Sequence, residues 1–201
     1  MKSNRKKIAS LWLILFSPLI ILSGLIFLTS IGFFGPLPSF EQLENPKNNL
    51  ATEIISEDGK VLGKFYFENR SNAQYSELPQ HLVDALIATE DIRFRSHSGI
   101  DLRALLRAVK GQFTGATGSG GASTITQQLA KMLFTERPAS GMERVMQKFK
   151  EWIIAVRLER QYTKDEIINM YLNRFDFVNN AVGIKSAAQV YFNTTTTELS
   201  L

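Results

Sequence analysis

Gly121-Ala-Ser-Thr-Ile-Thr-Gln-Gln-Leu-Ala-Lys-Met-Leu-Phe134 is the segment that organises this chain, because it opens a helix directly behind a glycine-rich loop. Four of the seven residues from 115 to 121 are glycines, which indicates a mobile loop. Hydroxyl and amide side chains fill the first helical turns, and Lys131 follows them. Free backbone N–H groups and the positive dipole end favour an anion at such a start. Ordinary N-capping by Ser123 or Thr124 is the alternative interpretation.

A second stretch, Ala88-Thr-Glu-Asp-Ile-Arg-Phe-Arg-Ser-His-Ser-Gly-Ile-Asp101, follows an apolar helical run. Glu90 and Asp91 are adjacent and would point about 100° apart on a helix, so one can face a cleft while the other makes a structural bond. We interpret Glu90 as a candidate base, with a solvated helix end as the alternative. His97 is more simply a hydrogen-bonding strut. A carboxylate facing an anion-binding helix start suits chemistry on a phosphorylated sugar.

The spacing of apolar residues predicts a mainly α chain after Leu78. Residues 53–67 read instead as a β-hairpin with Asp58-Gly59 at its turn. Asp101 is a plausible N-cap, and Thr163-Lys-Asp-Glu166 matches a capping box. Six helices are predicted: from Pro79, from Asp101, from about Ser123, from Met142 to Val156, from Thr163, and from Ile184 to Phe192.

The predicted helix that begins near residue 142 has two unlike faces. Its apolar stripe is Met142, Val145, Met146, Phe149, Ile153 and Val156. At about 100° per residue, Arg144, Lys148 and Glu151 share the opposite face. That face is either a salt-bridged solvent surface or the lining of a cleft.

The N-terminus predicts a membrane anchor. Residues 8–34 contain no charged residue, and as a helix they would be roughly 40 Å long, enough to cross a hydrocarbon core. The basic tail before them favours a single-pass anchor in the cytoplasmic membrane, with the N-terminus inside and the rest on the extracytoplasmic side. A cleaved signal peptide is the alternative, but its apolar region is usually shorter.

The charge and the cysteine content of the chain argue against two kinds of ligand, nucleic acids and transition metals. Four of the 23 basic residues lie in the tail, and the remaining 19 balance 19 acidic residues. The sequence pI of about 9.3 therefore comes from the tail, and the chain does not look like a nucleic-acid binder. With no cysteine and only two histidines, a transition-metal site is not expected.

Four ordered motifs resemble the peptidoglycan glycosyltransferase domain of class A penicillin-binding proteins, glycosyltransferase family 51. They are Glu90-Asp91-x-x-Phe94-x-x-His97-x-Gly99, Gly121-x-Ser123-Thr-Ile-Thr-Gln-Gln128, Lys148-Phe-Lys-Glu151 through Leu158-Glu159, and Tyr171-Leu-Asn173 with Ala187-Ala188-x-x-Tyr191-Phe192. The family domain usually has Asn where Met132 stands, and commonly Gly where Val178 stands.

The resemblance implies a lysozyme-like helical fold with a small N-terminal β-hairpin, preceded by one transmembrane helix. It implies polymerisation of lipid II into glycan strands, with inversion at the anomeric carbon and release of undecaprenyl pyrophosphate. Glu90 would deprotonate the acceptor hydroxyl. Glu151 would interact with the leaving group and with its bound Mg or Mn ion. The implied substrate-binding residues are Asp91, Phe94, His97, Ser123, Thr124, Gln127, Gln128, Lys131, Arg144, Lys148 and Asn173.

The expected organisation is a cytoplasmic tail (1–7), a transmembrane helix (8–34), a linker (35–52) and the glycosyltransferase domain (53–201), which the family continues past residue 201. The expected partners are lipid II, the growing glycan strand, the inner-membrane bilayer and other cell-wall synthesis proteins. No organic cofactor is expected. Two alternatives stay open: a lysozyme-like hydrolase that cleaves glycan, and a non-catalytic scaffold of the wall-synthesis complex.

Overall fold

The computed structural model describes residues 2–39, 42–43, 52–56, 61–65, 72–115, 121–135 and 138–200, and this part of the chain is mainly helical. Its α-helices are α1 (Lys2–Ser30), α3 (Gln80–Glu90), α4 (Leu102–Thr114), α5 (Ile125–Phe134), α6 (Gly141–Gln161), α7 (Lys164–Arg174) and α8 (Ile184–Phe192). Short 3₁₀ turns are η1 (Tyr75–Glu77), η2 (Phe94–Ser96) and η3 (Thr196–Glu198).

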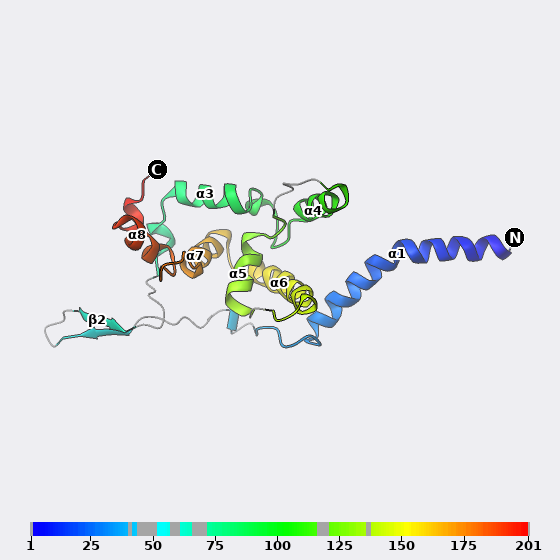
Figure 1. Cartoon of the computed structure of the whole chain (residues 1–201), viewed down its shortest axis with the longest axis horizontal. Coiled ribbons are helices and arrows are strands. Elements are labelled where there is room, and N and C mark those ends of the chain that lie inside the picture. Colours follow the sequence, from blue (N-terminus) through cyan, green and yellow to red (C-terminus); the bar gives the residue numbers. More distant parts are fainter. Residues whose placement is uncertain are drawn as a thin grey trace.

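The core forms where α5 packs against both α6 and α7. Figure 1 shows α5 standing between these two helices. Its buried side chains include Ile125 and Leu129 from α5, with Ile154, Leu158, Ile167 and Ile168 from the neighbouring helices. Full burial of one such side chain contributes about 1.5–3 kcal/mol. The start of α5, which carries the polar turn predicted to bind an anion, is therefore held on a rigid base.

Helix starts follow the capping chemistry of the sequence. Asp101 accepts a hydrogen bond from the Ala104 N–H at the start of α4, which confirms that predicted cap. Thr163 and Glu166 form the predicted capping box of α7. Thr124 caps α5, so the helix begins at Ile125, two residues later than the predicted start. The predicted last helix matches α8 at both ends.

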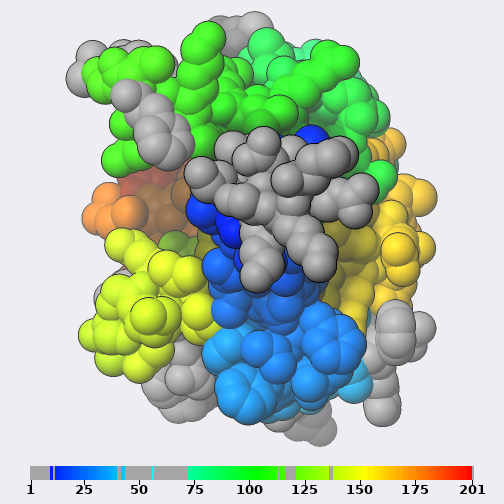
Figure 2. Space-filling model, turned by 90° about the vertical axis from the view of Figure 1, so that its right-hand side faces the viewer, coloured from blue at the N-terminus to red at the C-terminus, as the bar shows by residue number. Residues whose placement is uncertain are grey.

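One helix has the length and composition to cross a membrane, the segment Trp12–Ser30 of α1. Figure 1 shows α1 leading away from the helical body, with the N-terminus at its far end. Figure 2 looks onto the molecule from that side, so α1 points toward the viewer with α4 above it. α1 packs against α6, and Figure 1 shows that the end of α1 away from the N-terminus is the one that meets the body. The predicted span of 8–34 covers most of α1 and the turn that follows it.

Two strands, β1 (Thr52–Ile55) and β2 (Val61–Phe65), pair antiparallel with Thr52 opposite Phe65. Residues 58 and 59, where the sequence predicts the turn, lie outside the described residues.

The apolar stripe predicted for α6 was partly wrong. Met142 and Val145 are exposed, and the buried positions are Phe149, Ile154, Ala155 and Leu158 rather than Ile153 and Val156. The physical reason is that the first turns of α6 face the chain after α1 across an open pocket, so that they do not enter the core. On α4, Leu102, Leu106 and Val109 are also exposed.

Candidate active site

Glu90 is the last residue of α3, and its side chain is exposed on one wall of a cleft of about 210 Å³. The opposite wall is residues 121–124, the segment that leads into α5. The Glu90 Oε2 atom accepts a hydrogen bond from Gln128 Nε2 at 2.8 Å. A carboxylate at the end of one helix thus faces the start of another, as the two motifs led us to expect.

Asp91 lines the same cleft, but its carboxylate binds groups of the protein itself. It is only 8% exposed, and its Oδ2 atom accepts hydrogen bonds from His97 Nε2 at 2.9 Å and from the Ile125 N–H at 3.2 Å. The adjacent carboxylates therefore take unlike roles, because the helix ends between them. His97 is the strut that the sequence suggested: it ties the loop after α3 to Asp91, which in turn binds the first residue of α5.

Three predicted substrate contacts are built into the interior. Thr124 Oγ1 and Gln127 Nε2 both donate to the Gly99 carbonyl, at 2.7 and 3.1 Å, and both side chains are buried. Phe94 is fully buried beneath the same loop. In this structure these side chains hold the loop of residues 94–99 against α5. Thr124 also lines the Glu90 cleft, and the substrate contacts predicted for the three residues stay predictions.

The charged face of α6 is joined in part to the far wall of the Glu90 cleft, while its Arg144 is exposed. Lys148 Nζ donates to Ser123 Oγ at 2.7 Å and to Glu151 Oε2 at 2.9 Å. Glu151 is 5% exposed, whereas the Lys148 side chain is 38% exposed. The pair joins α6 to the segment that forms the far wall of the Glu90 cleft. This contact favours the cleft alternative for Lys148 and Glu151.

Two further cations lie beside this pair. Lys131 on α5 and Arg144 on α6 line a groove of about 640 Å³ together with Thr135 and residues 138–141. Within the described part of the chain neither cation forms an ion pair. Two cations that form no ion pair with a described residue favour a phosphate ligand in this groove.

Asn173 is placed elsewhere. Its side-chain amide donates to the Ala73 carbonyl and accepts from the Ala73 N–H, both at 2.8 Å. It therefore fixes the segment before η1 onto α7, and its predicted substrate contact stays a prediction.

Sequence reasoning missed a buried ionic cluster under the site. Glu159 on α6 accepts hydrogen bonds from Thr126 Oγ1 and from Lys164 Nζ. Lys164 also donates to the His97 carbonyl at 2.7 Å and lies 4.2 Å from the centre of the Phe94 ring. The sequence offered one signal for this cluster: Glu159 lies near the end of one helix and Lys164 at the start of the next, with a short turn between them. The cluster holds the His97 loop from below.

A divalent cation fits this site only with help from a ligand. Glu151 offers one buried carboxylate, already 2.9 Å from Lys148, and Mg²⁺ is commonly held by one or two carboxylates plus substrate phosphates. Elsewhere, Asp91, His97 and Asp101 each offer a ligand atom within 4.8 Å of one another. The Asp91 carboxylate already binds His97 and the Ile125 N–H. The Asp101 carboxylate already binds Arg93 and the Ala104 N–H.

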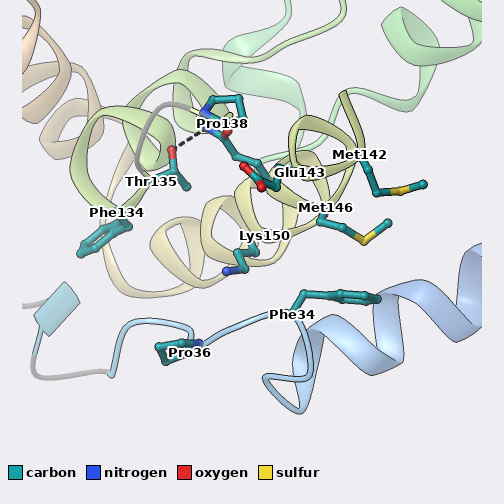
Figure 3. Close-up of a pocket in the computed structure, with 10 residues that line it drawn as sticks. Phe34, Pro36, Phe134, Thr135, Pro138, Met142, Glu143, Met146 and Lys150 are labelled. Carbon is teal, nitrogen blue, oxygen red and sulfur yellow. Dashed lines mark hydrogen bonds between the residues drawn. The ribbon is translucent and has the colours of Figure 1, made fainter. Parts of the chain in front are cut away.

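A pocket of about 550 Å³ opens at the foot of α1 (Figure 3). Phe34 and Pro36 come from the chain just after α1, and Met142, Met146 and Lys150 reach toward them from α6. Thr135 and Pro138 line both this pocket and the groove of Lys131 and Arg144. A largely apolar pocket and a cationic groove are thus neighbours.

Comparison with known proteins finds one matching family model and several relatives. The transglycosylase family model matches residues 58–201. Penicillin-binding protein 1A of Pseudomonas aeruginosa is 37% identical over 165 residues, which are 82% of this chain and 20% of that protein. Penicillin-binding protein 1F of Bacillus subtilis is 36% identical over 190 residues, 93% of this chain and 26% of that protein. Penicillin-binding protein 1A of Escherichia coli is 38% identical over 165 residues, 82% and 19% respectively. The chain spans about a fifth to a quarter of the length of these relatives.

Proposed function

Because the chain belongs to the transglycosylase family, we propose that it is a membrane-anchored peptidoglycan glycosyltransferase that polymerises lipid II into glycan strands. The observation that carries the proposal is the Glu90 cleft. An exposed carboxylate stands on one wall, and the other wall is tied through Ser123 to the Lys148–Glu151 pair. A base on one side and charge for a pyrophosphate on the other are what glycosyl transfer from a lipid pyrophosphate requires.

In the proposed reaction, Glu90 accepts the proton of the acceptor sugar's 4-hydroxyl as that oxygen attacks the anomeric carbon of the donor strand. The bond from that carbon to the pyrophosphate oxygen breaks, the configuration inverts, and undecaprenyl pyrophosphate leaves. Lys148, Lys131 and Arg144 supply positive charge toward the departing pyrophosphate. Glu151 would help to hold a divalent cation, which when bound would supply further positive charge toward the pyrophosphate.

The lipid part of the donor has a place in the same proposal. The cationic groove of Lys131 and Arg144 adjoins the pocket lined by Phe34, Met142 and Met146 at the foot of α1. We place the pyrophosphate in the groove and the first prenyl units in the pocket. A membrane anchor suits such a substrate, because its hydrocarbon tail stays in the bilayer. In this arrangement the N-terminal tail is cytoplasmic and the domain, which we propose to be lysozyme-like, lies on the extracytoplasmic side.

The test is product analysis. Detergent-solubilised protein is incubated with labelled lipid II in one sample and with preformed glycan strands in another, and the products are separated on a gel. We expect a ladder of polymer from lipid II and no shortening of glycan strands. Shortening without polymer would identify a hydrolase, and no change in either sample would favour a scaffold; each result would overturn the proposal.

A further inference from the structure

A short chain of hydrogen bonds links three helices behind Glu90. The Tyr171 hydroxyl on α7 donates to Gln128 Oε1 on α5 at 3.0 Å. Gln128 Nε2 then donates to Glu90 Oε2 at the end of α3 at 2.8 Å. Among the described residues Gln128 is the hydrogen-bond partner of this carboxylate, and no hydrogen bond reaches Glu90 Oε1.

Tyr171 is a fixed starting point for this chain of bonds. Its side chain is 3% exposed, and its ring stacks on Phe175 with 5.5 Å between centroids. Burial, with the nearby Glu90 charge, raises the pKa of Tyr171 to about 12. The phenol therefore keeps its proton throughout the range in which the protein works, and it remains a hydrogen-bond donor.

A glutamine amide has one acceptor oxygen and one donor nitrogen, so the bond to Tyr171 decides which end meets Glu90. With Oε1 held by the phenol, the NH₂ group must face the carboxylate. If the amide turned over, its oxygen would confront a negative oxygen. Gln128 cannot set its own orientation, because its side chain is only half-buried and rotates about a terminal bond.

We propose that Tyr171 is a positioning residue, which through Gln128 holds one oxygen of Glu90 and leaves the other free to take the acceptor's proton. This inference rests on the proposed function, since it concerns the same base. It also reassigns Gln128, which the sequence placed among the substrate-binding residues, to the support of Glu90.

The test compares Tyr171→Phe, Gln128→Leu and the double variant with a matched control, Tyr162→Phe. The control also removes a tyrosine hydroxyl that donates a hydrogen bond, here to the Leu43 carbonyl at 2.6 Å, but that bond is not part of the chain from Tyr171 through Gln128 to Glu90. We expect Tyr171→Phe to lower kcat for lipid II polymerisation about three- to tenfold while KM changes by less than about twofold. Gln128→Leu should lose more, and the double variant should be no slower than Gln128→Leu.

A second readout needs no substrate. The side-chain amide signals of Gln128, identified in ¹H–¹⁵N spectra by their loss in Gln128→Leu, should move in Tyr171→Phe and stay in place in Tyr162→Phe. Unmoved amide signals in Tyr171→Phe, equal loss of kcat in Tyr171→Phe and Tyr162→Phe, or additive losses in the double variant would each overturn the positioning role. If the wild type does not polymerise lipid II, the proposed function fails, while the amide signals still decide whether Tyr171 orients Gln128.

Discussion

Single residues at this site differ sharply from their neighbours in the chain. Glu90 is exposed in the cleft, whereas Asp91, the next residue in the chain, is buried and binds His97 and the first N–H of α5. The change occurs where α3 ends, because Asp91 leaves helical geometry with φ −158°. A helix end thus allows two adjacent carboxylates to serve chemistry and structure separately.

Val178 adopts a backbone conformation that is unfavourable for valine. Its φ is +68°, in the left-handed region that a β-branched side chain rarely adopts, and its side chain is largely exposed. Val178→Gly should therefore raise the free energy of unfolding by up to about 1 kcal/mol, since relief of 1–2 kcal/mol of strain exceeds the entropy cost of glycine. Thermal unfolding measures the change. Val190→Gly, an exposed position within α8, is the control and should destabilise; a lower melting temperature for Val178→Gly would contradict this reading.

At the scale of elements, the loop of residues 94–99 lies directly on α6. Gly99 has φ +89°, and a Cβ there would come within 2.9 Å of the Ala155 backbone carbon and oxygen. We expect Gly99→Ala to cost more than about 2 kcal/mol of stability and to displace the loop of residues 94–99. Gly115→Ala is the matched control, because its φ is +65° with nothing within 4 Å of the added carbon. Equal urea midpoints for the two variants would show that the close approach is unimportant.

The start of α4 gives a pH-dependent prediction. Burial opposes the charge on Asp101, but the Ala104 N–H and the Arg93 guanidinium outweigh it and hold the pKa of this carboxyl below its ordinary value of 3.8. The unfolded chain therefore binds the proton more readily, so Asp101 stabilises the fold above about pH 4 and ceases to do so as pH falls through its folded pKa.

Asp101→Ala should accordingly cost about 1–2 kcal/mol at pH 7 and progressively less below pH 4. Asp101→Asn keeps a capping oxygen without the charge, so it should lose less at pH 7. Unfolding free energies measured from pH 3 to pH 7 give the comparison. A deficit of Asp101→Ala that does not depend on pH would contradict the charged role.

Local features of these elements could be predicted from the sequence, and long-range ones could not. The Asp101 cap, the Thr163 capping box and the limits of α8 depend on residues three or four positions apart, so spacing reveals them. The interior roles of Thr124 and Asn173 depend on Gly99 and Ala73, which are 25 and 100 residues away. Residue type and local spacing do not reveal such distant hydrogen-bond partners.

At the scale of the whole molecule, apolar surface and charged residues follow one another from α1 to the Glu90 cleft. The exposed apolar residues of α1 lead to the pocket at its foot, the pocket adjoins the Lys131–Arg144 groove, and the Lys148–Glu151 pair connects to the Glu90 cleft. The sequence predicted the anchor, the two glutamates and the basic residues. Their connection through Ser123, and the support of Glu90 from Tyr171, required the packing of α5 against α6 and α7.

Charged substitutions in α1 test whether this helix anchors the protein in the membrane. Ile20→Lys together with Phe27→Lys places two cations on exposed apolar positions of α1, each costing about 2.5–3.5 kcal/mol near the middle of a bilayer. We expect the variant to shift from the alkaline-carbonate-resistant membrane fraction to the extract, while Val190→Lys on α8 stays in the membrane. Retention of the double variant would count against α1 as the anchor.

The most direct measurement is the rate of lipid II polymerisation by Glu90→Gln beside Asp84→Asn. Asp84 is a fair control, because it is an exposed carboxylate on the same helix that also accepts one bond from a glutamine amide, Gln80 Nε2 at 2.8 Å. Loss of a general base lowers turnover about 10²- to 10⁴-fold, so we predict that Glu90→Gln gives almost no polymer while Asp84→Asn matches the wild type. Polymerisation by Glu90→Gln at the wild-type rate would contradict the assignment of Glu90 as the base.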